Sequence, residues 1–293
     1  MGLFDRLFGR REGRKPRPPK EESFSRPAPQ KKAGRQEEEP KPASSLLAGN
    51  IQGQGQREGQ EDSFALFNSS DPARRKEQGL LAIVADGMGG MKDGKAASEA
   101  AVEVFRHRFL QWDGLEAVPE WLYRGAFAAN DQIFCQSRGL SGTTLTAVHI
   151  LGDDLYWISV GDSAIFLKRR EGVFQLNREH TYLNQLYAKE LEEDVICKER
   201  AENDEDARRL TSFIGIVHLK EVDLTLRPWK LKEGDVILLC SDGISGVLTM
   251  PELKEAMSLN PDEGCALLET MVLEKGIPEQ DNYTGVMIAC GGK

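Results

Sequence analysis

The chain has 293 residues, of which 40% are hydrophobic and 29% charged, and its net charge at pH 7 is −9. This length and apolar content suffice for a buried core, so the composition excludes a wholly disordered chain. No run approaches the roughly 18 apolar residues that span a bilayer, and the N-terminus lacks the apolar stretch and small-residue cleavage site of a signal peptide. We therefore expect a globular, cytoplasmic protein.

The first 42 residues differ from the rest in charge and composition. They hold 12 Lys and Arg against 7 Asp and Glu, a net charge of +5 that leaves −14 for the remaining chain, and they contain seven of the 13 prolines. Large apolar side chains are scarce there, so this basic segment cannot bury enough surface to fold. We predict a disordered tail over residues 1–45 and a folded domain over residues 46–293.

The tail opens with GLFDRLFGRR, which places four apolar side chains on one helical face beside arginines: Leu3, Phe4, Leu7 and Phe8. Such a segment suits docking, through residues 1–20, to an anionic membrane surface or to a groove on a partner protein. A disordered tail with a few apolar residues is the alternative.

From Asn50 onward, short apolar runs rich in Val, Ile, Leu and aromatic residues recur along the chain, as is typical of strands. Turns rich in Gly and Asp separate several of these runs and indicate antiparallel hairpins. The predicted strands cover residues 80–85, 144–150, 155–160, 164–168, 222–228, 235–240 and 283–290.

Helical patterns lie between these strands. One covers residues 94–110, where Val102, Phe105 and Phe109 share a face, and another begins near Pro119, a residue favoured in the first helical turn. Helices that cover antiparallel sheets indicate a mixed α/β domain. Residues 186–208 carry nine acids and few aromatic residues, so we expect a mobile, charged flap there.

Five cysteines are widely spaced and form no C-x-x-C pair, which argues against a disulfide framework or a zinc site. We expect buried thiols at Cys135, Cys197, Cys240, Cys265 and Cys290.

Six acidic residues stand at the ends of predicted strands or apolar runs: Glu61, Asp62, Asp86, Asp162, Asp242 and Asp281. One Asp before Gly or Ser commonly makes a turn or caps a helix. Several acids at neighbouring strand ends share one rim, where carboxylates repel each other unless cations lie between them. No Cys or His belongs to the set, and hard oxygen ligands favour Mg²⁺ or Mn²⁺ over zinc. The pattern therefore predicts a metal site.

A nucleotide-binding loop is a weaker alternative for the same region. The segment GGMKDGKA, which starts at Gly89, fits G-x-x-x-x-G-K and then has Ala96 in place of Ser or Thr. Ala96 has no hydroxyl for Mg²⁺, and Asp86 would put a carboxylate beside the phosphates that such a loop binds through N–H groups. The glycine-rich run at 49–59 has no predicted strand before it and gives little support for a dinucleotide site.

Taken together, the motifs resemble those of the protein phosphatase 2C family of metal-dependent Ser/Thr protein phosphatases, over about residues 53–291. They are GQREGQEDS, ADGMGG, SGTTLTAV, SVGDS, CSDGI and QDNYTGV, in the family's order. For a bacterial-type member, the resemblance implies an α+β fold, a four-layer α-β-β-α sandwich of two mainly antiparallel sheets flanked by helices. It also implies hydrolysis of phosphoserine and phosphothreonine on proteins with two Mn²⁺ or Mg²⁺ ions and a weaker third.

Carried over onto this sequence, the resemblance implies that Asp86 binds both ions. Glu61 and the backbone carbonyl of Gly87 would bind one of them, and Asp242 and Asp281 the other. Asp162 would bind the third ion. Asp62 would orient metal-bound water, and Arg57 would receive the substrate phosphate through its planar guanidinium.

Two residues depart from the family's pattern. Met88 stands where many members have a His that protonates the leaving oxygen, so the general acid is unassigned. Arg178-Glu179-His180 stands where the family usually shows Asp-His, and we favour a structural over a catalytic reading of His180.

The implied mechanism is direct attack by a water that bridges two cations, without a phosphoenzyme. The cations lower the pKa of that water and neutralise charge on the phosphoryl oxygens. We expect phosphoprotein substrates, the targets of a Ser/Thr kinase in signal transduction, and no nucleic-acid partner. A catalytically silent scaffold that binds metal or phosphoprotein is the alternative, but a binding-only domain has little physical reason to keep so many uncompensated carboxylates together.

Overall fold

The computed structural model describes residues 45–88 and 93–291. The predicted tail, apart from its last residue, and the docking segment over residues 1–20 lie outside the described residues. The strands are β1 Leu46–Gly53, β2 Ser63–Phe67, β3 Leu80–Ala85, β4 Leu145–Leu151, β5 Asp154–Val160, β6 Ala164–Arg169, β7 Gly172–Gln175, β8 Asp223–Leu224, β9 Trp229–Lys230, β10 Val236–Cys240 and β11 Tyr283–Cys290. The helices are α1 Pro72–Gln78, α2 Gly94–Gln111, α3 Val118–Ser137, α4 Tyr182–Glu190, α5 Lys198–Glu202, α6 Asp242–Ser245, α7 Met250–Ala256 and α8 Pro261–Glu274.

The strands form two antiparallel sheets. One has the order β1-β11-β10-β6-β7, and the other has the order β2-β3-β4-β5-β8 with β9 also paired to β5. Every residue of β3 is buried, which fits its continuous apolar sequence LLAIVA because the strand has covered faces on both sides. The pairing confirms the hairpins predicted at the β4–β5 and β6–β7 turns.

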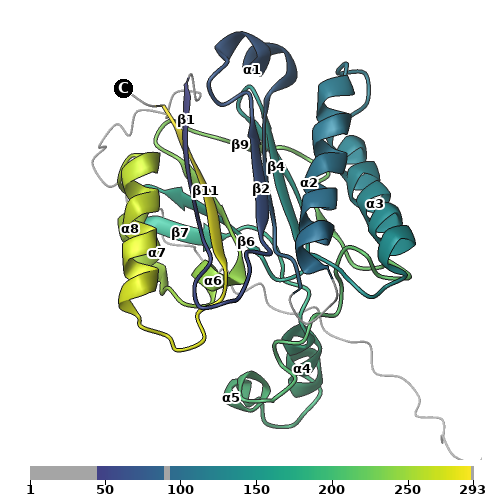
Figure 1. Ribbon diagram of the computed structural model, residues 1–293. Helices are drawn as coiled ribbons and strands as arrows, with labels where there is room; N and C mark the ends of the chain where they lie inside the picture. Colours follow the sequence, from purple (N-terminus) through teal and green to yellow (C-terminus); the bar gives the residue numbers. More distant parts are fainter. Residues whose placement is uncertain (1–44, 89–92, 292–293) are drawn as a thin grey trace, which may run out of the picture. The chain divides into compact units, whose positions relative to one another are not determined.

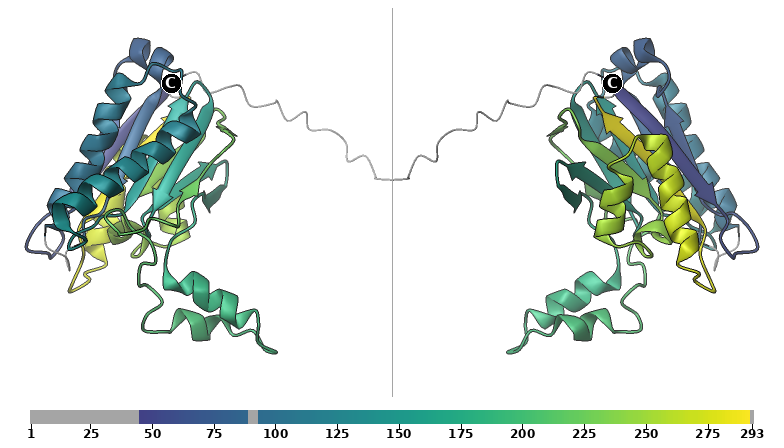
Figure 2. Two further views of the ribbon diagram at one scale, coloured as in Figure 1. Left: turned by 90° about the vertical axis from the view of Figure 1, so that its right-hand side faces the viewer. Right: turned by 90° about the vertical axis from the view of Figure 1, so that its left-hand side faces the viewer.

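The two sheets pack face to face, and helices cover their outer faces (Figures 1 and 2). A core of residues from β3, β4, β5, β6, β10 and β11 fills the space between the sheets. Helices α2 and α3 pack on the sheet that contains β3, and α7 and α8 pack on the sheet that contains β11. This arrangement confirms the predicted four-layer α-β-β-α sandwich.

Helix α2 follows the predicted helical spacing. Its buried face includes Ala97, Ala101, Phe105 and Phe109, which recur every four residues. Gly125 of α3 allows the Phe105 ring to approach, since a Cβ at position 125 would lie 2.8 Å from the ring. Small residues on α3 therefore admit the large aromatic side chains of α2.

Strand β1 was missed, because the first strand predicted from the apolar runs began at Leu80. The sequence LLAGNIQG has two glycines and no clear alternation, so its strand character depends on pairing with β11 along its whole length. A Cβ at Gly49 would lie 2.7 Å from the Pro261 carbonyl carbon. Close packing of α8 on β1 therefore accounts for the glycine that weakened the strand pattern.

The strand predicted at residues 222–228 was too long, since β8 covers only Asp223–Leu224. The Trp157 N–H donates to the Thr225 hydroxyl at 2.9 Å instead of to a backbone carbonyl. The Thr225 N–H still donates to the Trp157 carbonyl at 3.1 Å, so the side chain replaces one of the two backbone bonds of this pair, and the regular ladder ends there.

The acidic segment at residues 186–208 contains the end of α4 and all of α5. Glu190, whose side chain is mostly buried, accepts two hydrogen bonds from the Arg200 guanidinium at 2.6 and 2.5 Å. This paired contact joins the two helices.

The prediction that all five cysteines are buried was only partly right. Cys240, Cys265 and Cys290 are buried, Cys197 is half-buried and Cys135 is exposed, and all five are free thiols. No helix in the described part of the chain is long and apolar enough to cross a membrane.

His149 occupies an aromatic cage between β4 and the helices. Its ring centroid lies 5.0 Å from that of Trp112, 5.8 Å from Phe109 and 5.9 Å from Trp121. Nε2 lies 2.6 Å from the Gln78 carbonyl and therefore donates, whereas Nδ1 has no partner. Burial lowers the pKa of His149 to about 4, because a second proton would find no acceptor in the cage.

We expect acid to destabilise the protein through His149. The unfolded chain binds this proton below pH ~6.5 and the folded protein only below about 4, so the free energy of unfolding falls as pH drops through that window. Between pH 7.5 and 5 this residue should account for a loss of about 2 kcal/mol. Urea unfolding of wild type and His149→Gln at both pH values measures it. An equal pH dependence in the two proteins would contradict the assignment.

Candidate active site

A pocket of about 150 Å³ lies at the end of the sandwich where β3, β5 and β10 finish and β2 and β11 begin. Its lining residues are Arg57, Glu61, Asp86, Gly87, Met88, Thr144, Asp162, Leu210, Asp242 and Asp281. The structure thus brings together seven of the eight site residues predicted from the sequence. Asp62 does not line this pocket.

Asp62 lies behind the pocket as a fully buried carboxyl group. Its Oδ2 accepts from the Ser241 hydroxyl at 2.8 Å, while its Oδ1 has no partner. Burial raises the pKa of Asp62 to about 6, although the hydrogen bonds it accepts oppose that shift.

The turn after β3 holds Asp86 through its backbone. The Asp86 N–H donates to Thr144 Oγ1 at 2.9 Å, and its carbonyl accepts from the Thr143 hydroxyl at 2.8 Å and from the Thr144 N–H at 2.9 Å. With its backbone satisfied by these threonines, Asp86 has its carboxyl left to face the pocket.

The Glu61 backbone is held in a similar way by Asn282, the residue before β11. Asn282 Oδ1 accepts from the Glu61 N–H at 2.7 Å, and its Nδ2 donates to the carbonyls of Gln54 and Gly59 at 2.7 and 3.0 Å. One neutral side chain therefore fixes the loop that carries Arg57 and Glu61.

The carboxyl groups around the pocket make each other's ionisation costly. Burial raises the pKa of Asp86 well above its usual range, and the charges of Asp62 and Asp242 add to that effect. Burial also raises the pKa of Asp162 to about 7, and the charge of Asp242 adds to that shift. Burial raises the pKa of Asp242 as well, and the Asp242 Oδ1 atom has no hydrogen-bond partner. Cations would relieve this repulsion.

The donor set suits a hard divalent cation. Carboxylates and a backbone carbonyl are the groups that Mg²⁺ and Mn²⁺ prefer, and the unpartnered oxygens of Asp62 and Asp242 are left to accept further contacts. As placed, no three or more Asp, Glu, His or Cys side chains among the described residues could hold a metal ion. The donor atoms are of the kind that binds Mg²⁺ or Mn²⁺. Their present positions do not form a binding site, so side chains would have to move to coordinate an ion.

Arg57 is the one basic residue among the described residues that line the pocket. Its guanidinium donates to Asp281 Oδ2 at 2.6 Å, and this hydrogen bond raises the pKa of Arg57. The Arg57 side chain is 54% exposed and the Asp281 side chain 39%. A cation bound by Asp281 would compete with Arg57 for this carboxylate, and an Arg57 released in this way could bind an anion.

Gly87 is required by close backbone packing. A Cβ at this position would lie 2.4 Å from the Gly94 carbonyl oxygen and 2.5 Å from that of Glu61. The glycine after Asp86 thus lets the start of α2 and the Glu61 loop meet at the pocket. Its neighbour Met88 lines the pocket with a thioether, which cannot donate a proton.

His180 does not line the pocket. It is buried, and its Nδ1 accepts from the Gly161 N–H at 3.2 Å. Burial lowers the pKa of His180, which favours a neutral ring, and its Nδ1 also lies 3.3 Å from the Gly161 carbonyl oxygen.

Sequence reasoning missed Leu210 and Ser241. Leu210 lines the pocket after the acidic segment, and no local pattern distinguishes it from other leucines. Ser241 stands immediately before Asp242 in the motif CSDGI, so its position was the only available signal.

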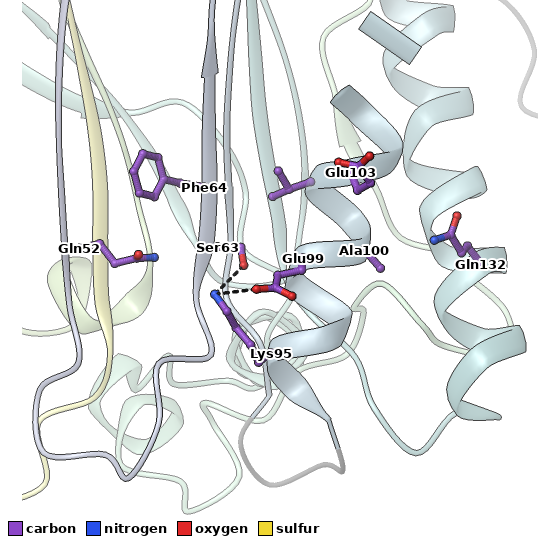
Figure 3. Close-up of a pocket in the computed structure, with 9 residues that line it drawn as sticks. Gln52, Ser63, Phe64, Lys95, Glu99, Ala100, Glu103 and Gln132 are labelled. Atoms are coloured by element: carbon purple, nitrogen blue, oxygen red, sulfur yellow. Dashed lines mark hydrogen bonds and ion pairs between the residues drawn. The ribbon is translucent and has the colours of Figure 1, made fainter. Parts of the chain in front are cut away.

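Two larger pockets lie near the acids. One of about 460 Å³ shares Asp162, Asp242 and Asp281 with the small pocket and reaches Arg208 beyond them. The other, of about 590 Å³, lies between β1, β2 and α2 (Figure 3). There Lys95 Nζ donates to the Asp62 carbonyl at 2.8 Å, so α2 also fixes the segment that carries the buried acid.

Known proteins resemble this chain both in sequence and in structure. A family model described as protein phosphatase 2C matches residues 57–276. The chain is 29% identical to the serine/threonine phosphatase stp of Listeria monocytogenes over 205 residues, which are 67% of this chain and 77% of that relative. The structure matches that of the serine/threonine phosphatase PstP/Ppp of Mycobacterium tuberculosis with a TM-score of 0.69 and 26% identity, over 84% of this chain and 99% of that chain.

A further solved structure is the catalytic domain of the serine/threonine protein phosphatase PstP in complex with two manganese ions. It matches with a TM-score of 0.67 and 25% identity, over 84% of this chain and 99% of that one.

We expect Gly87→Ala to lower the free energy of unfolding by about 1–3 kcal/mol, because the new methyl group would overlap two backbone oxygens. Gly59→Ala is the matched control, since a Cβ at Gly59 meets no atom within 4 Å. Urea unfolding midpoints of both variants and wild type test the expectation. Equal midpoints for the two variants would contradict the packing described for Gly87.

Proposed function

The chain belongs to the protein phosphatase 2C family, and we propose that its acid-lined pocket holds two Mn²⁺ or Mg²⁺ ions for the hydrolysis of phosphoserine and phosphothreonine on proteins. It is a serine/threonine protein phosphatase, as its curated relatives are named. One observation supports the proposal most strongly. Among the described residues that line the pocket, five have carboxylate side chains and one is basic.

The proposed ligands are Glu61, Asp86, the backbone carbonyl of Gly87, Asp242 and Asp281 for two ions, and Asp162 for a weaker third. The oxygen donors of this set, the raised pKa values of Glu61, Asp86, Asp162 and Asp242, and the two manganese ions bound by a structural relative support this assignment. Such cations, when bound, would lower the pKa of the attacking water and would neutralise charge on the phosphoryl oxygens.

Two further residues act beside these ligands. Asp62 Oδ1, which is buried and without a partner, would accept a proton from the attacking water and orient it. Arg57, once released from Asp281, would bind the phosphate with its planar fork of N–H donors. Met88 supplies no proton to the leaving oxygen.

The domain organisation and partners belong to the same proposal. Residues 46–293 would form the catalytic domain, with residues 186–208 as a charged flap beside the pocket. The substrates would be cytoplasmic phosphoproteins modified by a Ser/Thr kinase, in signal transduction. Docking through residues 1–20 stays a prediction, because that segment lies outside the described residues.

The other candidate functions have less support. A catalytically silent scaffold would be more stable with neutral side chains in place of the clustered carboxylates, because each buried charge without a partner destabilises the domain. The nucleotide-loop reading placed its key residues at 89–96, and Gly89 lies outside the described residues. The family match over residues 57–276 accounts for that segment as part of a phosphatase.

We expect turnover of an aryl phosphate and a phosphothreonine peptide only with added Mn²⁺ or Mg²⁺. Asp86→Asn and Asp242→Asn should each lower kcat/KM on the order of 100-fold or more, because the remaining acids cannot retain both ions. In chelator, Asp86→Asn should raise the melting temperature, since it removes a buried charge from the cluster. Asp131→Asn, at an exposed position on α3, is the control that should change neither property. Full turnover in chelator would refute metal dependence.

Arg57→Ala should raise KM for the phosphothreonine peptide about tenfold and lower kcat less, because the guanidinium binds the phosphate in the ground and transition states alike. Steady-state kinetics at saturating Mn²⁺ measure both constants. Arg74→Ala, which removes an exposed ion pair with Asp71, should leave them unchanged. A fall in kcat at constant KM would show that Arg57 acts on the chemical step instead.

A further inference from the structure

We propose that Asn177 and His180 are positioning residues that join the Asp162 turn to the root of the charged flap, so that the two move as one unit. The inference rests on the proposed function, because it concerns the placement of Asp162 in the pocket. It follows from the contacts of a short segment, residues 177–181, which leads from β7 into α4.

His180 holds the turn on the side that precedes Asp162. Its backbone N–H donates to the Gly161 carbonyl at 2.8 Å, and its Nδ1 accepts from the Gly161 N–H at 3.2 Å. Gly161 has φ of +104°, and a Cβ there would lie 2.7 Å from Thr144 Cγ2. The peptide groups on both sides of this glycine are therefore fixed by a single residue.

Asn177 holds the turn on the side that follows Asp162. Its Nδ2 donates to the Ser163 carbonyl at 2.9 Å and to the Ser159 hydroxyl at 3.1 Å, and its Oδ1 accepts from the Ile165 N–H at 2.7 Å. Asn177 is buried and uses both ends of its amide. Asp162 is thus clamped from both sides through its neighbours, and its own carboxyl stays free to face the pocket.

The same segment also holds the chain that returns from the flap. The Thr211 N–H donates to the His180 carbonyl at 2.9 Å, and Thr181 forms an antiparallel bridge with Leu210. At the next position the Tyr182 N–H donates to the Arg209 carbonyl at 2.9 Å. Because Leu210 lines the acidic pocket, a displacement of the flap root would reach that residue and the Asp162 turn together.

A double-mutant cycle tests whether His180 acts through Asp162. His180→Ala should lower kcat/KM for the phosphothreonine peptide about tenfold, and His180→Asn should restore most of it, because an amide Oδ1 can replace Nδ1 as acceptor. In an Asp162→Asn background, His180→Ala should change kcat/KM less than about twofold. His149→Gln is the control for loss of a buried histidine far from the pocket. Independent effects of the two substitutions would overturn the proposal.

Amide hydrogen exchange gives a readout that does not depend on turnover. In His180→Ala, exchange at residues 160–164 and 209–212 should accelerate about tenfold, while β10 stays unchanged. If wild type hydrolyses no phosphate, the proposed function fails, yet this measurement still tests the link. Acceleration at residues 209–212 alone, or equally throughout β10, would overturn the proposal. If His180→Ala does not fold, Asn177→Ser allows the same comparison from the other side of the turn.

Discussion

Repulsion between carboxylates around one small pocket is the constraint on which the rest of this structure depends. Burial raises the pKa values of Asp62, Asp86, Asp162 and Asp242, so the folded domain pays a free-energy cost to keep them charged near neutral pH. Arg57 offsets part of that charge through Asp281. Divalent cations bound in the pocket would offset the remaining negative charge of the acids. An anionic substrate would in turn be attracted to those cations.

The scaffold holds Asp86 and Glu61 through hydrogen bonds to their backbones, which leaves their carboxyl groups to face the pocket. Thr143 and Thr144 satisfy the backbone of Asp86, and Asn282 fixes that of Glu61. Neutral hydrogen bonds are suited to this task, because a basic partner on each acid would neutralise the charge that a cation must find. The large apolar cores on either face of each sheet keep the strand ends in register while the rim stays polar.

The pocket is continuous with surfaces that a protein substrate would contact. The 460 Å³ pocket extends from Asp162 and Asp242 to Arg208 on the segment that returns from α5. The ion pair between Glu190 and Arg200 joins the two flap helices, in a segment that contains few aromatic residues. The root of the flap therefore lies beside the acids, and backbone contacts such as Thr211 N–H to the His180 carbonyl hold it there.

Features that depend on neighbouring residues could be predicted from the sequence. The predicted bounds of two strands match those of β3 and β11. The acids at the ends of the apolar runs were also identified, together with the preference of their oxygen atoms for hard cations. Such patterns depend on periodicity and local turn chemistry, which a few residues contain. Strand β1 was not predicted, because its structure depends on pairing with β11 and on packing against α8. Tertiary structure alone decided the Arg57–Asp281 contact, which joins residues 224 positions apart, and the place of Leu210 in the pocket. The raised pKa values likewise arise from burial by many segments at once, and no local pattern contains that information.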